Sequence, residues 1–246
     1  MDYGFIKVAA ATPKIKVADV DCNTELICNQ IDEAAKNGAK VLVFPELCLT
    51  GYTCSDLFWQ SLMLEKVKEK TIEIARYSKD YDMLIMIGIP YEHNGKLYNV
   101  GVVLHKGKVL GVVTKKHLPN YSEFYEARHF TKGFEKVVTV DFAGQKVPMG
   151  MNILFKCENR PDMVIGVEIC EDLWVPNPPS IRHTMAGATI IANLSASDEV
   201  TGKSIYRRDL VAGQSARLIC GYIYADAGEG ESSTDLVYSA HNMIAE

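Results

Sequence analysis

The stretch that decides the fold reads Val167-Glu168-Ile169-Cys170-Glu171-Asp172-Leu173-Trp174. The apolar run at residues 163–169 predicts a buried strand, and Cys170 closes that strand directly before two acids. A thiol that emerges at a sheet edge can act as a nucleophile, and the backbone N–H groups after it can face an oxyanion. Because a free thiol is only a few per cent ionised near pH 7, it also needs a neighbouring base. The alternative is a buried, apolar cysteine, which is the commonest role of a lone cysteine.

Strand patterns and helix patterns alternate around this stretch. Strands are expected at residues 5–11, 41–44, 83–89, 97–104, 109–114, 137–142, 188–194 and 222–225, and final strands at 236–238 and 243–245. Helices are expected at residues 26–35, 64–75 and 204–218. Turns at Asn94-Gly95, Lys106-Gly107 and Ala143-Gly144 predict hairpins. Helical and hairpin connections together imply an α/β fold with a mixed sheet or two sheets, and helices on the outside.

Composition narrows the class of protein. The chain has 246 residues, is 48% hydrophobic and contains no linker or repeat, which indicates one folded domain. A net charge of -5 with dispersed basic residues argues against binding to nucleic acid. No apolar stretch approaches the ~20 residues that span a bilayer, and the first seven residues lack the pattern of a signal peptide. Seven scattered cysteines without a Cys-x-x-Cys pair fit reduced thiols and a cytoplasmic location.

A second candidate site residue is Glu46, in Phe44-Pro45-Glu46-Leu47 directly after a predicted strand. A carboxylate at the carboxyl edge of a sheet lies where α/β proteins usually bind ligands, and a low dielectric there would make it a usable general base. A solvated loop glutamate is the alternative.

A third candidate is Lys115, in Thr114-Lys115-Lys116-His117-Leu118-Pro119. Its ammonium ends an apolar strand and could stabilise a developing oxyanion. A lysine that reaches solvent is the alternative, and Lys116 is expected on the opposite face because side chains alternate along a strand.

Other chemistries lack a motif. The six histidines show neither the spacing of a metal-binding helix nor a zinc pattern with cysteines, so no metal is expected. There is no Gly-x-Ser-x-Gly elbow and no phosphate-binding loop.

The three candidates together, in this order, resemble the Glu–Lys–Cys triad of the nitrilase (carbon–nitrogen hydrolase) superfamily over essentially the whole chain. Within it, the chain is most similar to the glutaminase domain of glutamine-dependent NAD+ synthetases. The segments that carry this likeness are 118–126, 170–176, 193–197, 206–208 and 230–235.

This resemblance implies a four-layer α-β-β-α sandwich and a glutaminase reaction. Glu46 would take the thiol proton, Cys170 would attack the side-chain amide of glutamine to form a thioester, and Lys115 would hold the oxyanion. Glutamate and ammonia would leave, and no cofactor would be needed. The resemblance further implies a glutamine pocket formed by Tyr121, Phe124, Glu171 and Ser197. It also implies a second acid after the lysine, for which Glu123 and Glu126 both qualify and Glu126 is preferred.

This sequence differs from the glutamine-dependent NAD+ synthetases in one large respect. The synthetases continue into a domain with a Ser-Gly-Gly-x-Asp-Ser nucleotide loop, which uses the ammonia in NAD+ synthesis, and that loop is absent here. We therefore expect residues 1–246 to be a carbon–nitrogen hydrolase (glutaminase) domain that is truncated at its C-terminal end, with the synthetase domain as its partner. A homo-oligomer is expected from the family. Two alternatives are a stand-alone aliphatic amidase or nitrilase, and a non-catalytic oligomerisation module.

Overall fold

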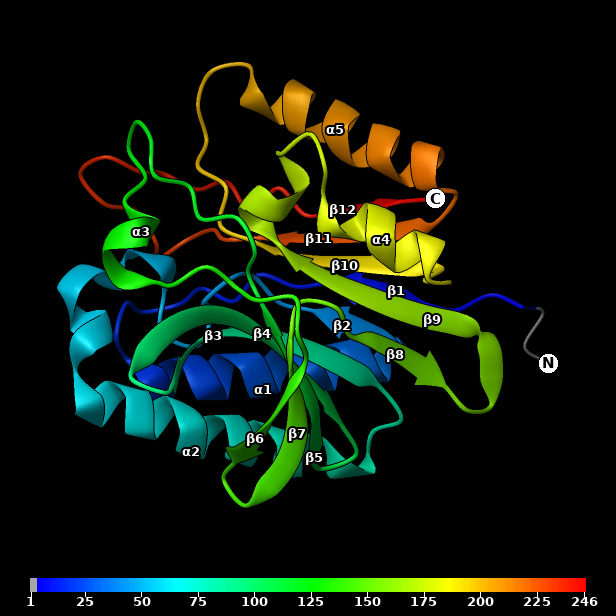
Figure 1. Cartoon of the computed structure of the whole chain (residues 1–246), viewed down its shortest axis with the longest axis horizontal. Coiled ribbons are helices and arrows are strands. Elements are labelled where there is room, and N and C mark those ends of the chain that lie inside the picture. Colours follow the sequence, from blue (N-terminus) through cyan, green and yellow to red (C-terminus); the bar gives the residue numbers. More distant parts are fainter. Residues whose placement is uncertain (1–3) are drawn as a thin grey trace.

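The computed structural model describes residues 4–246. Residues 1–3 lie outside the described residues. The predicted domain begins with them, as does the N-terminal segment that lacks the pattern of a signal peptide. The described chain forms two sheets (Figure 1). The first sheet has seven strands in the order β1-β2-β3-β4-β5-β7-β6. These strands are β1 (Val8–Ala10), β2 (Val41–Val43), β3 (Leu84–His93), β4 (Lys96–His105), β5 (Lys108–Thr114), β6 (Val138–Phe142) and β7 (Gln145–Gly150).

The second sheet has five strands in the order β12-β11-β10-β9-β8. They are β8 (Leu154–Cys157), β9 (Arg160–Ile169), β10 (Ile190–Ser195), β11 (Gly221–Asp226) and β12 (Met243–Ala245). Strands β9, β10 and β11 are parallel, and β1, β2 and β3 are parallel in the first sheet. Their carboxyl ends therefore each form a sheet edge of the kind at which α/β proteins bind ligands.

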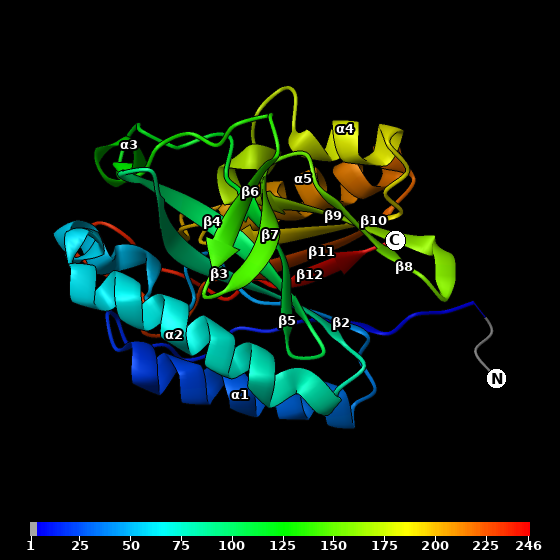
Figure 2. The same ribbon diagram turned by 60° about the horizontal axis from the view of Figure 1, so that its bottom comes forward.

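Helices cover the outer face of each sheet, as Figures 1 and 2 show. Helices α1 (Val20–Lys36) and α2 (Ser61–Tyr77) lie on the seven-stranded sheet, and α4 (Pro179–Met185) and α5 (Lys203–Leu218) lie on the five-stranded sheet. Short helical segments complete the elements: η1 (Tyr52–Trp59), η2 (Ser78–Asp80), α3 (Glu126–His129) and η3 (Cys170–Leu173). Among residues 4–246, none of the helices has the length and apolar character that a membrane span requires.

Three apolar clusters hold the layers together. Between the sheets, Val43 and Val103 of one inner face pack with Val167, Leu194 and Ile223 of the other. A larger cluster joins α1 and α2 to the first sheet, and a smaller one joins α5 to the second. The predicted four-layer α-β-β-α sandwich is thus confirmed.

The local signals explain most of the elements. Asp19 caps α1 by accepting a hydrogen bond from the N–H of Cys22 at 3.1 Å, and Ile27, Ile31 and Ala34 form its buried face. The three predicted turns join β3 to β4, β4 to β5, and β6 to β7. In each turn both central residues have positive φ, which a glycine at the second position favours.

Three details differ from the sequence prediction. Residues 236–238 are irregular, although the predicted strand at 243–245 is present as β12. The first strand is shorter than predicted, and Phe5 is 78% exposed rather than buried. Strands β7 and β8 and helix α4 were not predicted, because their apolar residues are too few to produce a clear period.

Candidate active site

The predicted site residues come from different strands of both sheets. Glu46 follows β2 and Lys115 follows β5, both in the seven-stranded sheet, whereas Cys170 follows β9 in the five-stranded sheet. All three side chains are buried. The site therefore lies where the loops at the carboxyl ends of strands from the two sheets meet.

Backbone packing fixes the loop that carries Glu46. Strand β3 passes so close that a Cβ on Gly88 would lie 2.2 Å from the N atom of Leu47 and 2.6 Å from the carbonyl oxygen of Pro45. Only glycine allows this approach. The Glu46 carboxylate is then held on both oxygens. Oε1 accepts from Asn99 Nδ2 at 2.6 Å, and Oε2 accepts from the N–H of Ala196 at 3.1 Å.

The Lys115 ammonium lies between two carboxylates. Its Nζ is 2.5 Å from Oε1 of Glu46 and 2.5 Å from Oε1 of Glu126. Burial alone would lower the pKa of Lys115, but the charges of Glu126 and Glu46 reverse this and raise the pKa above its ordinary value. The ammonium is therefore a fixed positive charge in a site shielded from water.

Glu126, at the first position of α3, is the second acid on this ammonium. Burial raises its pKa to about 8, against the opposing effect of Lys115 and with a further increase from the charge of Glu46. Glu123 instead lines the neighbouring cavity. The sequence left both Glu123 and Glu126 as candidates for the second acid, and only Glu126 contacts the Lys115 ammonium.

Cys170 occupies a sharp bend between β9 and η3. Its φ is 43°, in the left-handed region that side chains other than glycine rarely adopt. Its N–H donates to Asn193 Oδ1 at 3.1 Å. Asp172 ties this bend to the lysine loop, because its carboxylate accepts from the N–H of Ile169 at 3.2 Å and from that of His117 at 2.8 Å.

The thiol of Cys170 is neutral at rest. Burial raises the pKa of Cys170 well above its ordinary value, and the charge of Glu46 raises it further. Lys115 and hydrogen bonds from Ser195 and Ala196 oppose the shift without cancelling it. A nucleophilic thiolate therefore requires proton transfer to a base as the substrate reacts.

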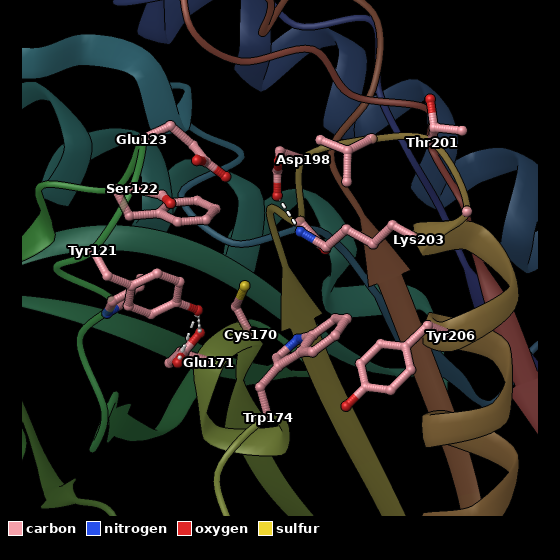
Figure 3. Close-up of a pocket in the computed structure, with 15 residues that line it drawn as sticks. Tyr121, Ser122, Glu123, Cys170, Glu171, Trp174, Asp198, Thr201, Lys203 and Tyr206 are labelled. Atoms are coloured by element: carbon pink, nitrogen blue, oxygen red, sulfur yellow. Dashed lines mark hydrogen bonds and ion pairs between the residues drawn. The ribbon is translucent and has the colours of Figure 1, made fainter.

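A cavity of about 440 Å³ opens over the thiol (Figure 3). The four residues predicted to bind the substrate all line it, together with Cys170: they are Tyr121, Phe124, Glu171 and Ser197. Tyr121 donates its hydroxyl to Oε2 of Glu171 at 3.0 Å. Burial raises the pKa of Glu171, which Tyr121 partly offsets.

Sequence reasoning missed several residues of the site. Asn99, Asp172 and Asn193 hold Glu46 and the Cys170 bend, and Trp174, Asp198, Lys203 and Tyr206 line the cavity. A polar Asn99 inside an otherwise apolar strand was a usable signal. The roles of the others depend on contacts between distant parts of the chain.

Two other cysteines are packed inside the protein as ordinary buried residues. Cys48 and Cys54 are buried, and burial raises the pKa of each to about 12. Cys170 is the one cysteine among the described residues that lines the cavity. Within residues 4–246, no cluster of three or more His, Cys, Asp or Glu side chains has the arrangement of a metal site.

Known proteins of similar sequence cover almost the whole of this chain. The glutamine-dependent NAD(+) synthetase of Mycobacterium tuberculosis is 40% identical over 244 residues, which are 99% of this chain and 36% of the synthetase. That of Aquifex aeolicus is 29% identical over 97% of this chain and 38% of its own length. The chain thus spans little more than a third of these relatives.

Solved structures show the same fold. The crystal structure of a glutamine-dependent NAD(+) synthetase from Cytophaga hutchinsonii matches with a TM-score of 0.88 and 33% identity, over 98% of this chain and 39% of that one. An amidase from Nesterenkonia sp. matches with a TM-score of 0.74 and 18% identity, over 97% of this chain and 81% of that one, which shows the fold alone. The family model for carbon-nitrogen hydrolase matches residues 7–245. This chain therefore belongs to the carbon–nitrogen hydrolase family.

Proposed function

We propose that this chain is a cysteine-dependent glutaminase, which hydrolyses the side-chain amide of glutamine to glutamate and ammonia. The observation that carries the proposal is the Lys115 ammonium, 2.5 Å from both Glu46 and Glu126, behind a cavity lined by Cys170 and Glu171. A nucleophile, a base and a fixed cation around one hollow are the parts that acyl transfer from an amide requires.

The first half-reaction begins with proton transfer from Cys170 to Glu46. The thiolate attacks the amide carbon, and the tetrahedral oxyanion is held by Lys115 and by the N–H of Glu171. The intermediate collapses as Glu46 passes its proton to the departing nitrogen. Ammonia leaves and a thioester remains on Cys170. In these steps Lys115 and the N–H of Glu171 interact most strongly with the oxyanion of the transition state. They therefore stabilise the transition state more than the bound substrate, which lowers the barrier to reaction.

Water completes the reaction. Glu46 accepts a proton from a water molecule as that water attacks the thioester, and the proton then returns to the sulfur as glutamate leaves. Glu126 holds Lys115 in place throughout, which its contact at 2.5 Å supports. Because side chains supply the nucleophile, the base and the cation, the reaction needs no cofactor.

The relatives suggest the use of the ammonia. They are synthetases named as glutamine-dependent, and this chain matches little more than a third of their length. We propose that the ammonia serves NAD+ synthesis on a synthetase domain, in a cytoplasmic homo-oligomer.

Ammonia release from a panel of amides tests the proposal. L-glutamine, a short aliphatic amide and a short nitrile are offered to the wild type, to Cys170→Ala and to the matched control Cys28→Ala. We expect glutamine to be hydrolysed and the activity to disappear only in Cys170→Ala. Inert glutamine with a cleaved aliphatic amide would instead make the chain a stand-alone amidase, and no ammonia from any compound would favour a docking role.

A further inference from the structure

A series of hydrogen bonds runs from the bend at Cys170 into the layer between the five-stranded sheet and its helices. The N–H of Cys170 donates to Oδ1 of Asn193 at 3.1 Å, and Nδ2 of Asn193 donates to the hydroxyl of Tyr222 at 3.0 Å. Tyr222 in turn donates to Oε1 of Glu168, whose Oε2 accepts from the N–H of Ser180 at 2.8 Å. We call this series the Glu168 network. The proposed reaction assigns no role to Tyr222 or Glu168.

The register of β9, β10 and β11 brings these side chains together. Asn193 of β10 pairs with Glu168 of β9, and Ile191 of β10 pairs with Tyr222 of β11. Because side chains alternate along a strand, all four point to the face that α4 and α5 cover (Figure 1). Glu168, Asn193 and Tyr222 are each at most 1% exposed. Their polar atoms therefore depend on partners inside the protein.

One order of donors satisfies the Glu168 network. A backbone N–H can only donate, so the Asn193 amide turns its oxygen to Cys170 and its NH2 to Tyr222. A hydroxyl that accepts from this NH2 uses its single hydrogen for Glu168. Without an acceptor at Glu168, the hydroxyl could donate to a reversed Asn193 amide, whose NH2 would then face the N–H of Cys170.

We propose that Glu168 and Tyr222 are positioning residues for the nucleophile. They fix the amide of Asn193, which holds the bend at Cys170 in the shape that the reaction requires. This inference rests on the proposed function. The φ of Cys170 is 43°, a strained conformation that persists only where surrounding contacts determine it. In the proposed reaction the next N–H, that of Glu171, faces the oxyanion, so a relaxed bend would displace this donor and the sulfur together.

The variant Tyr222→Phe interrupts the network and keeps the ring, which belongs to the same apolar cluster as Ile191 and Val211. The fold should therefore be retained. A misplacement of reacting groups by about 1 Å can slow a reaction by about 100-fold. We expect kcat for ammonia release to fall about 10-fold in Tyr222→Phe, with KM within about twofold of the wild type, because the contacts of the bound substrate are unchanged.

The matched control is Tyr91→Phe, which removes a hydroxyl from another buried tyrosine. Tyr91 lies on β3, and its hydroxyl donates to the carbonyl oxygen of Asp141 at 3.3 Å, outside the network. Its kcat should stay within about twofold of the wild type.

The variant Glu168→Gln interrupts the network at its other end. Glutamine is of similar size but offers one oxygen to two donors, the hydroxyl of Tyr222 and the N–H of Ser180. It should lower kcat about as much as Tyr222→Phe does, and the two changes together should lower it little further.

Exchange of the Cys170 amide hydrogen with solvent reports directly on the bend. In Tyr222→Phe, NMR of the protein without substrate should show this hydrogen exchanging about 10-fold faster than in the wild type. The amide hydrogens of Ile165 and Val167 in the same strand should keep their rates. A general loss of stability would instead accelerate all three.

A double-mutant cycle tests whether Tyr222 acts through Asn193. Asn193→Ala alone should lower kcat about 100-fold, and addition of Tyr222→Phe should lower it by less than about twofold further. The same factor for Tyr222→Phe in both backgrounds would overturn the proposal, as would an unchanged Cys170 exchange rate in Tyr222→Phe. If Asn193→Ala does not fold, that exchange rate decides alone. A wild type that releases no ammonia from glutamine would overturn the glutaminase, and the exchange rate would still decide the role of the network.

Discussion

The Nζ of Lys115 lies 2.5 Å from Oε1 of Glu126, and both side chains are almost completely buried. Glu126 therefore holds this ammonium in place, and burial raises the pKa of Glu126 itself to about 8. We expect Glu126→Gln to lower kcat about 100-fold with little change in KM, because the lost interaction acts on the oxyanion rather than on the bound substrate. Steady-state ammonia release measures both constants.

The matched control is Glu123→Gln, since Glu123 lies three residues earlier and lines the cavity. Its kcat should stay within about threefold of the wild type. A larger loss of kcat in Glu123→Gln than in Glu126→Gln would show that Glu123, and not Glu126, is the second acid.

The adjacent residues Lys115 and Lys116 allow the role of the buried cation to be tested with a neighbouring lysine as control. Lys115 is buried between two carboxylates, whereas Lys116 is half-buried and its N–H donates to Asp172. Lys115→Met should reduce kcat by about 1000-fold or more, because the oxyanion loses its cation. Lys116→Met should retain activity within about threefold. The reverse order of effects would mean that the strand is out of register by one residue.

The sequence could place the three central residues because each one follows a strand with an obvious apolar run. Glu46, Lys115 and Cys170 come after strands β2, β5 and β9, and all three strands were predicted. Strand β7 was not, since Gln145, Lys146 and Pro148 interrupt its pattern. The irregular segment at 236–238 was predicted as a strand because a short apolar run has the same pattern in a strand and in a buried loop.

The supporting contacts could not be predicted in the same way. Asn99 reaches Glu46 across 53 positions of the chain, and Asn193 reaches the N–H of Cys170 across 23. Such contacts depend on how the two sheets pack, which local patterns do not encode. The choice between Glu123 and Glu126 likewise depended on the turn before α3.

A buried acid should make stability depend on pH. Burial raises the pKa of Asp226 from 3.8 to about 7, with Arg207 opposing the shift. Because the native state then binds a proton that the unfolded state has lost, this group stabilises the fold fully below about pH 4 and progressively less up to about pH 7. The change is roughly 4 kcal/mol at most, at ~1.4 kcal/mol per pKa unit.

Asp226→Asn removes this titration and keeps an oxygen to accept the N–H of Ser197, which lies 2.8 Å from Asp226 Oδ1. The free energy of unfolding, from urea titrations between about pH 4 and pH 7, should fall less steeply in the variant. Asp235→Asn, at an exposed acid, serves as the control and should keep the wild-type slope. Parallel slopes for the wild type and Asp226→Asn would contradict the assignment.

The close approach at Gly88 should be sensitive to a single methyl group. A Cβ there would lie 2.2 Å from the N atom of Leu47, which belongs to the loop that holds Glu46. Gly88→Ala should lower the free energy of unfolding by about 2 kcal/mol or more and also reduce kcat.

Gly213→Ala is the counterpart, because Gly213 lies inside α5 and a Cβ added there would meet no atom within 4 Å. It should raise the free energy of unfolding by about 0.5–1 kcal/mol. Urea denaturation of both variants checks the pair, and a neutral Gly88→Ala would show that the loop can move aside.

The central claim is that Glu46 and Lys115 act together on the sulfur of Cys170. Its most direct test is peptide mapping after exposure to a glutamine analogue in which a chloromethyl ketone replaces the side-chain amide, with and without excess L-glutamine. We predict one labelled cysteine out of seven, Cys170, with labelling suppressed by glutamine and about 100-fold slower in Glu46→Gln. Labelling at another cysteine, or a Glu46→Gln variant that reacts at the wild-type rate, would contradict the account.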